Sequence, residues 1–267
     1  MESDAEGCAT FTMSHAGALM LFRQWTDSEL TLTKVVVTTE GGDTVELNVA
    51  AKYLKNFVAG SAYRIVCEYS ENFECVDLGL STGTLWSNMN LGAKASYEYG
   101  DFYGWGELEV KAGYYYASNY RFYLPTGEST DCSKYFKDGR LELEDEDDVA
   151  TVKLGSDYRM PYVSEWKALK EECVWDEVVV NDYAVFKVTG PNKKFIYIPK
   201  NGYKFSNGGD EGVHNRGDNG YYWCRDKKFD ANPGTAGYAN PSTKTIINIG
   251  ENNRYKGLGI RAVKRSK

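Results

Sequence analysis

One short tyrosine-rich stretch in the first half of the chain has the composition of a recognition surface. A tyrosine side chain offers a rigid apolar ring and a hydroxyl, and it loses little conformational entropy when it contacts a partner. The residues that we expect to contact a ligand for this reason are Tyr114, Tyr115, Tyr116, Tyr120 and Arg121. The alternative is that the rings are packed inside the protein as strand aromatics. For half of the residues this alternative explains the pattern as well as ligand contact does.

The residue patterns that catalysis requires do not occur in this sequence. Only two histidines are present in 267 residues, and neither belongs to a nucleophile elbow or to a metal-ligand spacing. The six cysteines include no Cys-x-x-Cys pair and are too few for a disulfide framework. We therefore expect a protein without catalytic residues.

The segment 164–173 has the spacing of an amphipathic helix. Trp166, Leu169 and Cys173 stand three and four residues apart, which places them on one helix face. Ser164 is a suitable N-cap residue. A helix of this length is too short to be stable alone, so we expect the Trp166 face to be buried. The residues expected on the opposite, solvent-exposed face are Glu165, Lys167, Lys170, Glu171 and Glu172.

The rest of the chain has the composition of a protein rich in strands and turns. Aromatic residues make up 14% of it, and it contains 27 glycines. The net charge of −7 argues against nucleic acid or an anionic membrane as the main partner. No run of about 18 apolar residues occurs, so no transmembrane segment is expected. The polar residues after Met1 do not have the pattern of a signal peptide, so we expect either a protein that stays inside the cell or one whose export signal is not present in this chain.

Alternating apolar residues divide the N-terminal part of the chain into short strands. We predict residues 1–9 to be a leader and residues 10–75 to form a small antiparallel β-sandwich-like module. The strands are expected at 9–13, 18–22, 30–38, 44–49 and 63–69. Phe-Thr-Met-Ser-His-Ala from residue 11 and Leu-Thr-Lys-Val from residue 32 resemble the start of fimbrillin-type surface proteins of Bacteroidetes.

The segment from Val76 onwards resembles a second family. Its motifs are Val-Asp-Leu-Gly-Leu from residue 76, Gly-Thr-Leu-Trp from 83, Trp-Gly-Glu from 105, Arg-Met-Pro from 159 and Gly-Ile-Arg from 259. This series is similar to the "Fibrobacter succinogenes major paralogous" domain of Bacteroidetes and Fibrobacter surface proteins. Its last two motifs are also similar to formylglycine-generating, sulfatase-modifying proteins, which adopt a C-type-lectin-like fold. The resemblance implies that fold for residues 76–267 and hence an α+β class.

The same resemblance implies where a ligand would bind. Lectin-like folds often place ligand contacts in a late loop, here 206–219, so Asn215, Asp218 and Asn219 are expected contacts. Such folds also often bind calcium through loop carboxylates, for which Asp210 and Glu211 are the candidates. A second candidate set is the acidic run 144–148, for which a solvated surface is the alternative. No other cofactor is expected.

The two resemblances together imply an exported protein at the cell surface or on a fimbria. We expect it to bind a glycan or a host or bacterial surface protein without catalysis. The first alternative is a structural pilus or surface-assembly subunit, whose partners are other fimbrial subunits. The second alternative is a sulfatase-modifying type of enzyme. That activity depends on a thiol pair in the C-terminal part of the fold, whereas only Cys224 follows residue 173.

Overall fold

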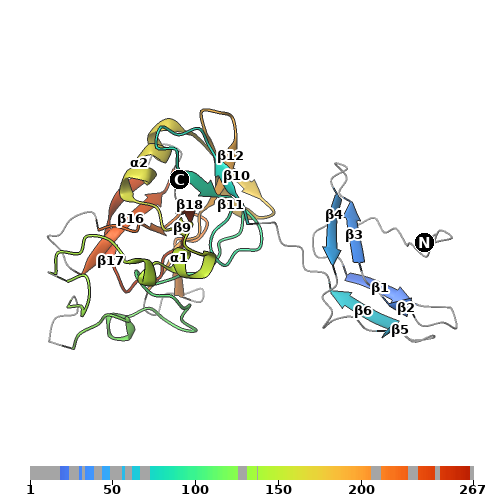
Figure 1. Ribbon diagram of the computed structural model, residues 1–267, viewed down its shortest axis with the longest axis horizontal. Helices are drawn as coiled ribbons and strands as arrows, with labels where there is room; N and C mark the ends of the chain where they lie inside the picture. The colour runs from blue at the N-terminus through green and yellow to red at the C-terminus, as the bar shows by residue number, and fades with distance from the viewer. Residues whose placement is uncertain are drawn as a thin grey trace. The chain divides into compact units, whose positions relative to one another are not determined.

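The computed structural model shows a chain of short strands and few helices (Figure 1). It describes the backbone of six strands between residues 19 and 66, and then residues 73–125, 131–136, 138–205, 212–227, 234–243 and 247–264. The chain divides into two compact units, Met1–Ser70 and Glu71–Lys267. All strand pairs described are antiparallel and the helices are short, so the predicted α+β class is correct at this level.

The N-terminal unit contains three strand pairs that are nested in the sequence. They are β1 (Leu19–Arg23) with β6 (Ala62–Val66), β2 (Leu30–Thr31) with β5 (Asn56–Phe57), and β3 (Lys34–Thr38) with β4 (Thr44–Asn48). The strands predicted at 18–22, 44–49 and 63–69 agree with β1, β4 and β6 to within a few residues. The single strand predicted at 30–38 is two strands, β2 and β3, which pair with different partners, and β5 was not predicted. The predicted leader and the strand expected at 9–13 lie outside the described residues.

The C-terminal unit is built from small sheets. The described sheets are β7 (Cys75–Asp77), β8 (Leu85–Ser87), β18 (Val263–Lys264) and β9 (Tyr158–Arg159); β10 (Val174–Val180), β11 (Tyr183–Thr189) and β12 (Phe195–Pro199); β15 (Tyr222–Trp223), β16 (Thr235–Pro241) and β17 (Ile247–Asn253); and β13 (Tyr203–Lys204) with β14 (Val213–His214). Val263 pairs with Trp86 on one side and with Arg159 on the other. The first sheet therefore joins the beginning, middle and end of this unit.

The described helices are two α-helices and two single 3₁₀ turns. They are α1 (Val149–Leu154), α2 (Val163–Glu172), η2 (Ala117–Asn119) and η3 (Asp145–Asp147). Asp148 caps α1, since its Oδ1 accepts hydrogen bonds from the backbone amides of Ala150 at 3.0 Å and Thr151 at 3.2 Å. None of the described helices combines the length and the hydropathy that crossing a bilayer requires.

Helix α2 is the helix that the spacing of Trp166, Leu169 and Cys173 predicts. Trp166 and Leu169 are fully buried, and the Trp166 ring packs edge-on against Trp86 with ring centroids 4.9 Å apart. The helix begins at Val163, so Ser164 is not its N-cap. Instead the Tyr162 amide, just before the helix, donates to Glu165 Oε2 at 2.8 Å.

Glu165 is a correction to the predicted solvent-exposed face of α2. Its side chain is buried, with 6% of the residue exposed. Arg159 donates to both of its carboxylate oxygens, at 2.6 and 2.8 Å, and the Thr84 hydroxyl donates to Oε1 at 2.7 Å. A carboxylate with these partners is stable inside the protein, so the helix buries more than its apolar stripe.

The hairpin of β10 and β11 was not predicted from the sequence. Val174–Val180 lacks strict alternation, because Asp176 and Glu177 stand together between apolar residues. The turn is made by Asn181 and Asp182, both with left-handed φ angles, 47° and 67°. Asparagine and aspartate tolerate that conformation better than other non-glycine residues, which suits a two-residue hairpin turn.

Candidate functional site

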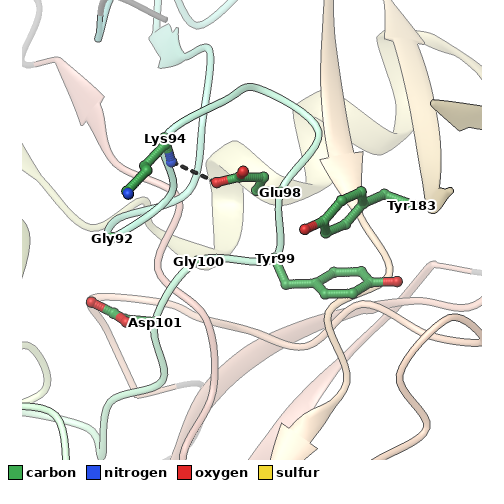
Figure 2. Close-up of a pocket in the computed structure, with 7 residues that line it drawn as sticks. All are labelled: Gly92, Lys94, Glu98, Tyr99, Gly100, Asp101 and Tyr183. Carbon is green, nitrogen blue, oxygen red and sulfur yellow. Dashed lines mark hydrogen bonds between the residues drawn. The ribbon is translucent and has the colours of Figure 1, made fainter. Parts of the chain in front are cut away.

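A polar cleft opens between the loop after β8 and the start of β11 (Figure 2). It is lined by Gly92, Lys94, Glu98, Tyr99, Gly100, Asp101 and Tyr183. The Tyr183 ring contacts the Tyr99 ring with centroids 4.8 Å apart, and Figure 2 shows the two rings next to each other. The Tyr97 ring lies 5.5 Å from Tyr183. The cleft therefore combines aromatic surface with charged groups.

Two glycines allow the loop to close around this cleft. Gly92 and Gly100 have φ angles of +83° and +70°, in the left-handed region that other residues rarely adopt. A Cβ atom on Gly92 would lie 2.2 Å from the Asp101 carboxylate. The Asp101 amide donates to Leu91 O at 2.9 Å, which holds the two arms of the loop together. The Glu98 carboxylate accepts a hydrogen bond from the Lys94 amide at 2.7 Å (Figure 2).

Arg216 links the cleft to the turn that follows β14. Its guanidinium carbon lies 5.2 Å from the centroid of the Tyr99 ring, and its Nε is buried without a hydrogen-bond partner. The turn is closed by Asn215, whose carbonyl accepts from the amides of Asp218 at 3.2 Å and Asn219 at 3.0 Å. The sequence pointed to this turn but not to Arg216, Tyr99 or the cleft.

The predicted contacts Asn215 and Asn219 lie together in this turn. Both side-chain amides donate to the Tyr221 hydroxyl, at 3.0 and 3.4 Å. Asp218 is exposed at the surface of the same turn. The structure thus brings the three predicted residues together, and their neighbour Arg216 reaches the cleft. Their role as ligand contacts stays a prediction.

Half-buried aromatic rings continue the surface beyond Tyr221. The Tyr203 ring lies 4.7 Å from Tyr221 and stacks on His214 at 5.1 Å, and the Tyr238 ring lies parallel to Tyr221 at 6.1 Å. His214 is therefore part of a strand and a ring stack, not a solvated loop residue. The Lys256 ammonium lies 5.2 Å from the Tyr203 ring, and burial lowers the pKa of Lys256.

The tyrosine-rich stretch does not form one surface. Tyr115 is fully buried and donates from its hydroxyl to Phe102 O, and burial raises the pKa of Tyr115 to about 12. Tyr120 is 5% exposed, and its hydroxyl donates to Trp105 O at 2.6 Å. Tyr115 and Tyr120 are therefore packed aromatic residues of the core, and the prediction that they contact a ligand is wrong.

The remaining predicted residues of this stretch are more accessible. Tyr114 and Tyr116 are 46% and 39% exposed, with ring centroids 6.1 Å apart. The Arg121 guanidinium pairs with Asp147 at 2.8 Å. Arg121 also lines a second, more apolar groove together with Glu107, Leu108, Glu109, Val110, Lys111 and Asn119.

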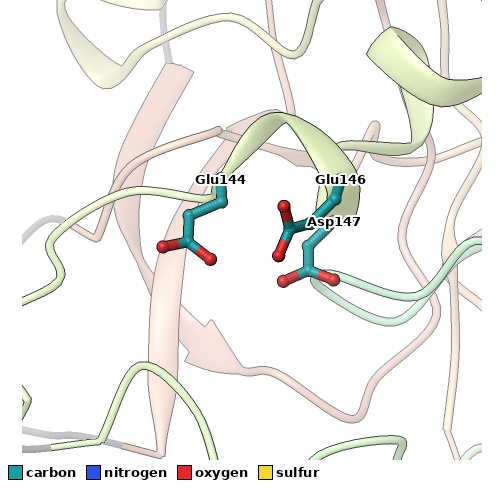
Figure 3. Close-up of side chains that lie close together, drawn as sticks. All are labelled: Glu144, Glu146 and Asp147. Atoms are coloured by element: carbon teal, nitrogen blue, oxygen red, sulfur yellow. The ribbon is translucent and has the colours of Figure 1, made fainter.

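Three carboxylates of the acidic run come together near η3 (Figure 3). One oxygen from each of Glu144, Glu146 and Asp147 lies within 4.8 Å of the others. The Lys134 ammonium already pairs with all three, at 2.5, 3.1 and 2.6 Å respectively. A metal ion would have to displace this ammonium, so we assign none to the triad.

The acidic run is a solvated surface only in part, since the side chains of Glu144, Asp145 and Glu146 are 41%, 58% and 73% exposed. Asp147 is 1% exposed, and Asp148 is fully buried. The Asp148 carboxylate pairs with Arg225 at 2.9 Å in addition to capping α1. Buried acids with basic partners of this kind stabilise a fold more often than they bind a cation. The other calcium candidates, Asp210 and Glu211, lie outside the described residues.

The described thiols have the environment of core residues. Cys75, Cys173 and Cys224 are free thiols, and Cys132 is buried. Cys224 is fully buried, and burial raises its pKa well above the usual value; burial likewise raises the pKa of Cys173 to about 12. A reactive cysteine requires a lowered pKa and solvent access, so these thiols have the opposite character.

Among known proteins, the chain matches no family model, no curated protein and no solved structure.

Proposed function

We propose that the C-terminal unit is a non-catalytic saccharide-binding domain with a C-type-lectin-like fold. We further propose that it belongs to an exported protein of the cell surface or of a fimbria. The single observation that carries the binding function is the cleft in which the Tyr99 and Tyr183 rings lie beside the charged groups of Glu98, Lys94 and Asp101.

The chemistry of that cleft suits a sugar. One face of a sugar ring carries C–H groups that pack against an aromatic ring, and its hydroxyls both donate and accept hydrogen bonds. In the cleft, Tyr99 and Tyr183 supply the ring surface. Glu98 and Asp101 supply acceptors, and Lys94 supplies a donor. A few placed polar groups beside an apolar wall are the usual composition of a small-ligand site.

The lectin-like fold is supported by how distant motifs meet. The Arg-Met-Pro motif contributes Arg159 to β9, and Val263, just after Gly-Ile-Arg, pairs with it in β18. Helix α2 begins shortly after the Arg-Met-Pro motif, and its Trp166 packs on Trp86 of the Gly-Thr-Leu-Trp motif. Three of the motifs that carry the family resemblance are therefore joined by strand pairing or side-chain packing.

A glycan array with the full chain tests the binding function. The Tyr99→Ala and Tyr183→Ala variants should bind the saccharides that the parent protein binds much more weakly or not at all. Tyr114→Ala is the matched control, because Tyr114 is exposed and lies outside the cleft. Binding that survives both cleft variants, or an array without any positive saccharide, would contradict the proposal.

The structural-subunit alternative is favoured by one separate observation. Strand β10 is at the edge of its sheet, and Val174 and Val179 are 63% and 72% exposed. An open, apolar edge strand can accept a strand from a neighbouring subunit. Under this alternative the full chain should assemble in light-scattering measurements, and Val179→Lys should prevent assembly without unfolding the protein. A chain that stays monomeric at high concentration would exclude this alternative.

A further inference from the structure

We infer that Asn90 determines the specificity of the saccharide cleft, because it fixes the position of the Tyr99 ring relative to the Tyr183 ring. It acts through a buried relay of hydrogen bonds that leads from Tyr99 to the end of β12. This inference rests on the proposed function, since it names the residue that holds the two rings of that site in place. Asn90 is not one of the lining residues of the cleft, so it is a positioning residue.

Asn90 stands at the base of the loop that carries Tyr99. The Ala93 amide donates to Asn90 O at 3.1 Å, which makes the first turn of the loop. The amide of the residue after Asn90, Leu91, donates to Ile260 O at 2.9 Å. The base of the loop is therefore attached to a late segment of the same unit, and Tyr99 extends from a fixed point.

The Asn90 side chain is buried and holds the loop from within. It is 1% exposed, and its Nδ2 donates to Tyr99 O at 2.8 Å and to the Tyr222 hydroxyl at 3.3 Å. Gly100 gives room for this contact, since a Cβ atom there would lie 2.8 Å from Asn90 Cβ. Within the part of the chain that the structure describes, Asn90 Oδ1 has no hydrogen-bond partner. A buried acceptor of this kind is unfavourable, so the contribution of the side chain lies in what Nδ2 donates.

Tyr222 continues the relay to the sheet that carries Tyr183. Its side chain is fully buried, and its ring packs against Trp166 with centroids 5.3 Å apart. Burial raises the pKa of Tyr222 to about 12, so the hydroxyl keeps its proton, and it donates to Pro199 O. Pro199 ends β12 and pairs with Val185 of β11, the strand that begins at Tyr183. The relay thus joins the loop wall of the cleft to its strand wall.

A second support of the Tyr99 ring reaches the same end of β12. The Arg216 guanidinium carbon lies 5.2 Å from the ring centroid. The amide of the next residue, Gly217, donates to Lys200 O at 2.8 Å, and the Lys200 amide donates to Ala184 O at 2.9 Å near the start of β11. Two supports therefore connect the two walls of the cleft, one through the Tyr99 backbone and one through its ring.

A cleft with fixed walls discriminates between similar sugars better than a loose one. Because the rings are in place before the ligand binds, the entropic cost of ordering them is small. Two sugars that differ in the direction of one hydroxyl then differ in whether that hydroxyl meets an acceptor such as Glu98 or a ring. If Tyr99 can move, both sugars can adapt to the cleft. Asn90 should therefore affect the preference between sugars as well as the affinity.

Calorimetric titrations with the full chain test this inference. The probes are oligosaccharides that end in glucose, galactose or mannose, since galactose and mannose each differ from glucose in the direction of one hydroxyl. Asn90→Leu keeps most of the side-chain volume but removes the donor. It should weaken the tightest probe about tenfold, the effect of one lost hydrogen bond, and should reduce the preference over the other two. Tyr222→Phe, which keeps the buried ring, should act in the same direction.

A double variant and a control separate the relay from general stability. The loss of affinity in Asn90→Leu/Tyr222→Phe should be close to that in Asn90→Leu alone, because either change already breaks the relay. Thr151→Val is the matched control. It also removes a buried side-chain donor to a backbone carbonyl, Tyr158 O at 2.8 Å, but from helix α1 and outside the cleft. It should lower the midpoint of thermal unfolding without changing affinity or preference.

A measurement without ligand tests the positioning directly. The parent protein and its variants are made with fluorotyrosine, and the fluorine NMR signals of Tyr99 and Tyr183 are assigned from Tyr99→Phe and Tyr183→Phe. Both signals should shift or broaden in Asn90→Leu and in Tyr222→Phe, because the two rings lie next to each other (Figure 2). They should stay unchanged in Thr151→Val.

The possible outcomes separate the two proposals. Unchanged fluorine signals in Asn90→Leu would overturn the positioning role, and unchanged affinity and preference would overturn its effect on specificity; both leave saccharide binding standing. An equal loss of affinity in Thr151→Val would show general destabilisation and would also overturn the inference. If the parent protein binds no saccharide, the proposed function fails, and the specificity assigned to Asn90 fails with it.

Discussion

The guanidinium of Arg159 pairs with both carboxylate oxygens of Glu165, at 2.6 and 2.8 Å, and both side chains are largely buried. This pair connects strand β9 with the first turn of helix α2. The same carboxylate accepts from the Tyr162 amide and from the Thr84 hydroxyl. It therefore organises the start of the helix, the sheet beside it and the loop before β8.

Removing the charge of Glu165 should destabilise the protein. Glu165→Gln leaves the Arg159 guanidinium buried without its counter-charge, for which we expect a loss of about 3 kcal/mol in the free energy of unfolding. Glu171→Gln is the control, because Glu171 is an exposed glutamate of the same helix. Urea unfolding at neutral pH measures both. Equal stabilities of the two variants would contradict the role of this pair.

The contribution of Glu165 should also depend on pH. Burial alone would raise the pKa of Glu165, but the hydrogen bonds and charge of Arg159 outweigh it, and the pKa is lowered. Its stabilisation is therefore complete above the unfolded-state pKa of about 4.5 and is lost as the pH falls through the lower folded-state pKa. The stability difference between the parent protein and Glu165→Gln should shrink below about pH 4.5. A stability difference between the two proteins that grows as the pH falls would contradict this prediction.

Gly92 should be needed for the shape of the cleft. Gly92→Ala adds a Cβ atom 2.2 Å from the Asp101 carboxylate at a φ of +83°, and Gly83→Ala adds one at a φ of +66° with no atom within 4 Å. The second variant therefore reports backbone strain alone, about 1–2 kcal/mol. Gly92→Ala should lose more stability than Gly83→Ala and should also lose saccharide binding. Thermal unfolding and the glycan array measure the two effects.

Lys134 should be required by the acidic triad. Burial opposes its charged form, but the hydrogen bonds that its ammonium donates to Asp147, Glu144 and Glu146 raise the pKa of Lys134 above the usual value. Lys134→Met leaves three adjacent carboxylates without that ammonium, so the midpoint of thermal unfolding should fall at neutral pH. Calcium should restore part of this loss in the variant, because the carboxylates are then open to a cation. A variant that melts like the parent would show that the ammonium contributes little.

Local patterns determined those elements whose side chains repeat with a clear period. The spacing of Trp166, Leu169 and Cys173 placed α2 within one residue of its observed start, because one buried stripe is enough to define a helix face. The alternating residues around Val35 and Val45 placed β3 and β4, since neighbouring strands of a hairpin need only a short turn. The segment Val174–Val180 has no such period, so its strand was not predicted from the sequence.

Contacts between distant residues decided the rest. The helical period assigns Glu165 to a polar face, but Arg159 and Thr84 provide the partners that allow it to be buried. Tyr115 and Tyr116 are adjacent tyrosines, yet one is in the core and the other exposed, because only the fold supplies the Phe102 carbonyl that satisfies the first hydroxyl.

The sequence by itself thus determined the β-rich class, the helix with its tryptophan and the turn that carries Asn215. The cleft at Tyr99, the position of Arg216 over that ring and the ammonium of Lys134 between three acids were decided by the tertiary structure alone. The physical reason is the same in each case. Whether a polar side chain is exposed, buried or neutralised depends on partners that lie far away in the sequence, and residue spacing does not encode where those partners come to lie.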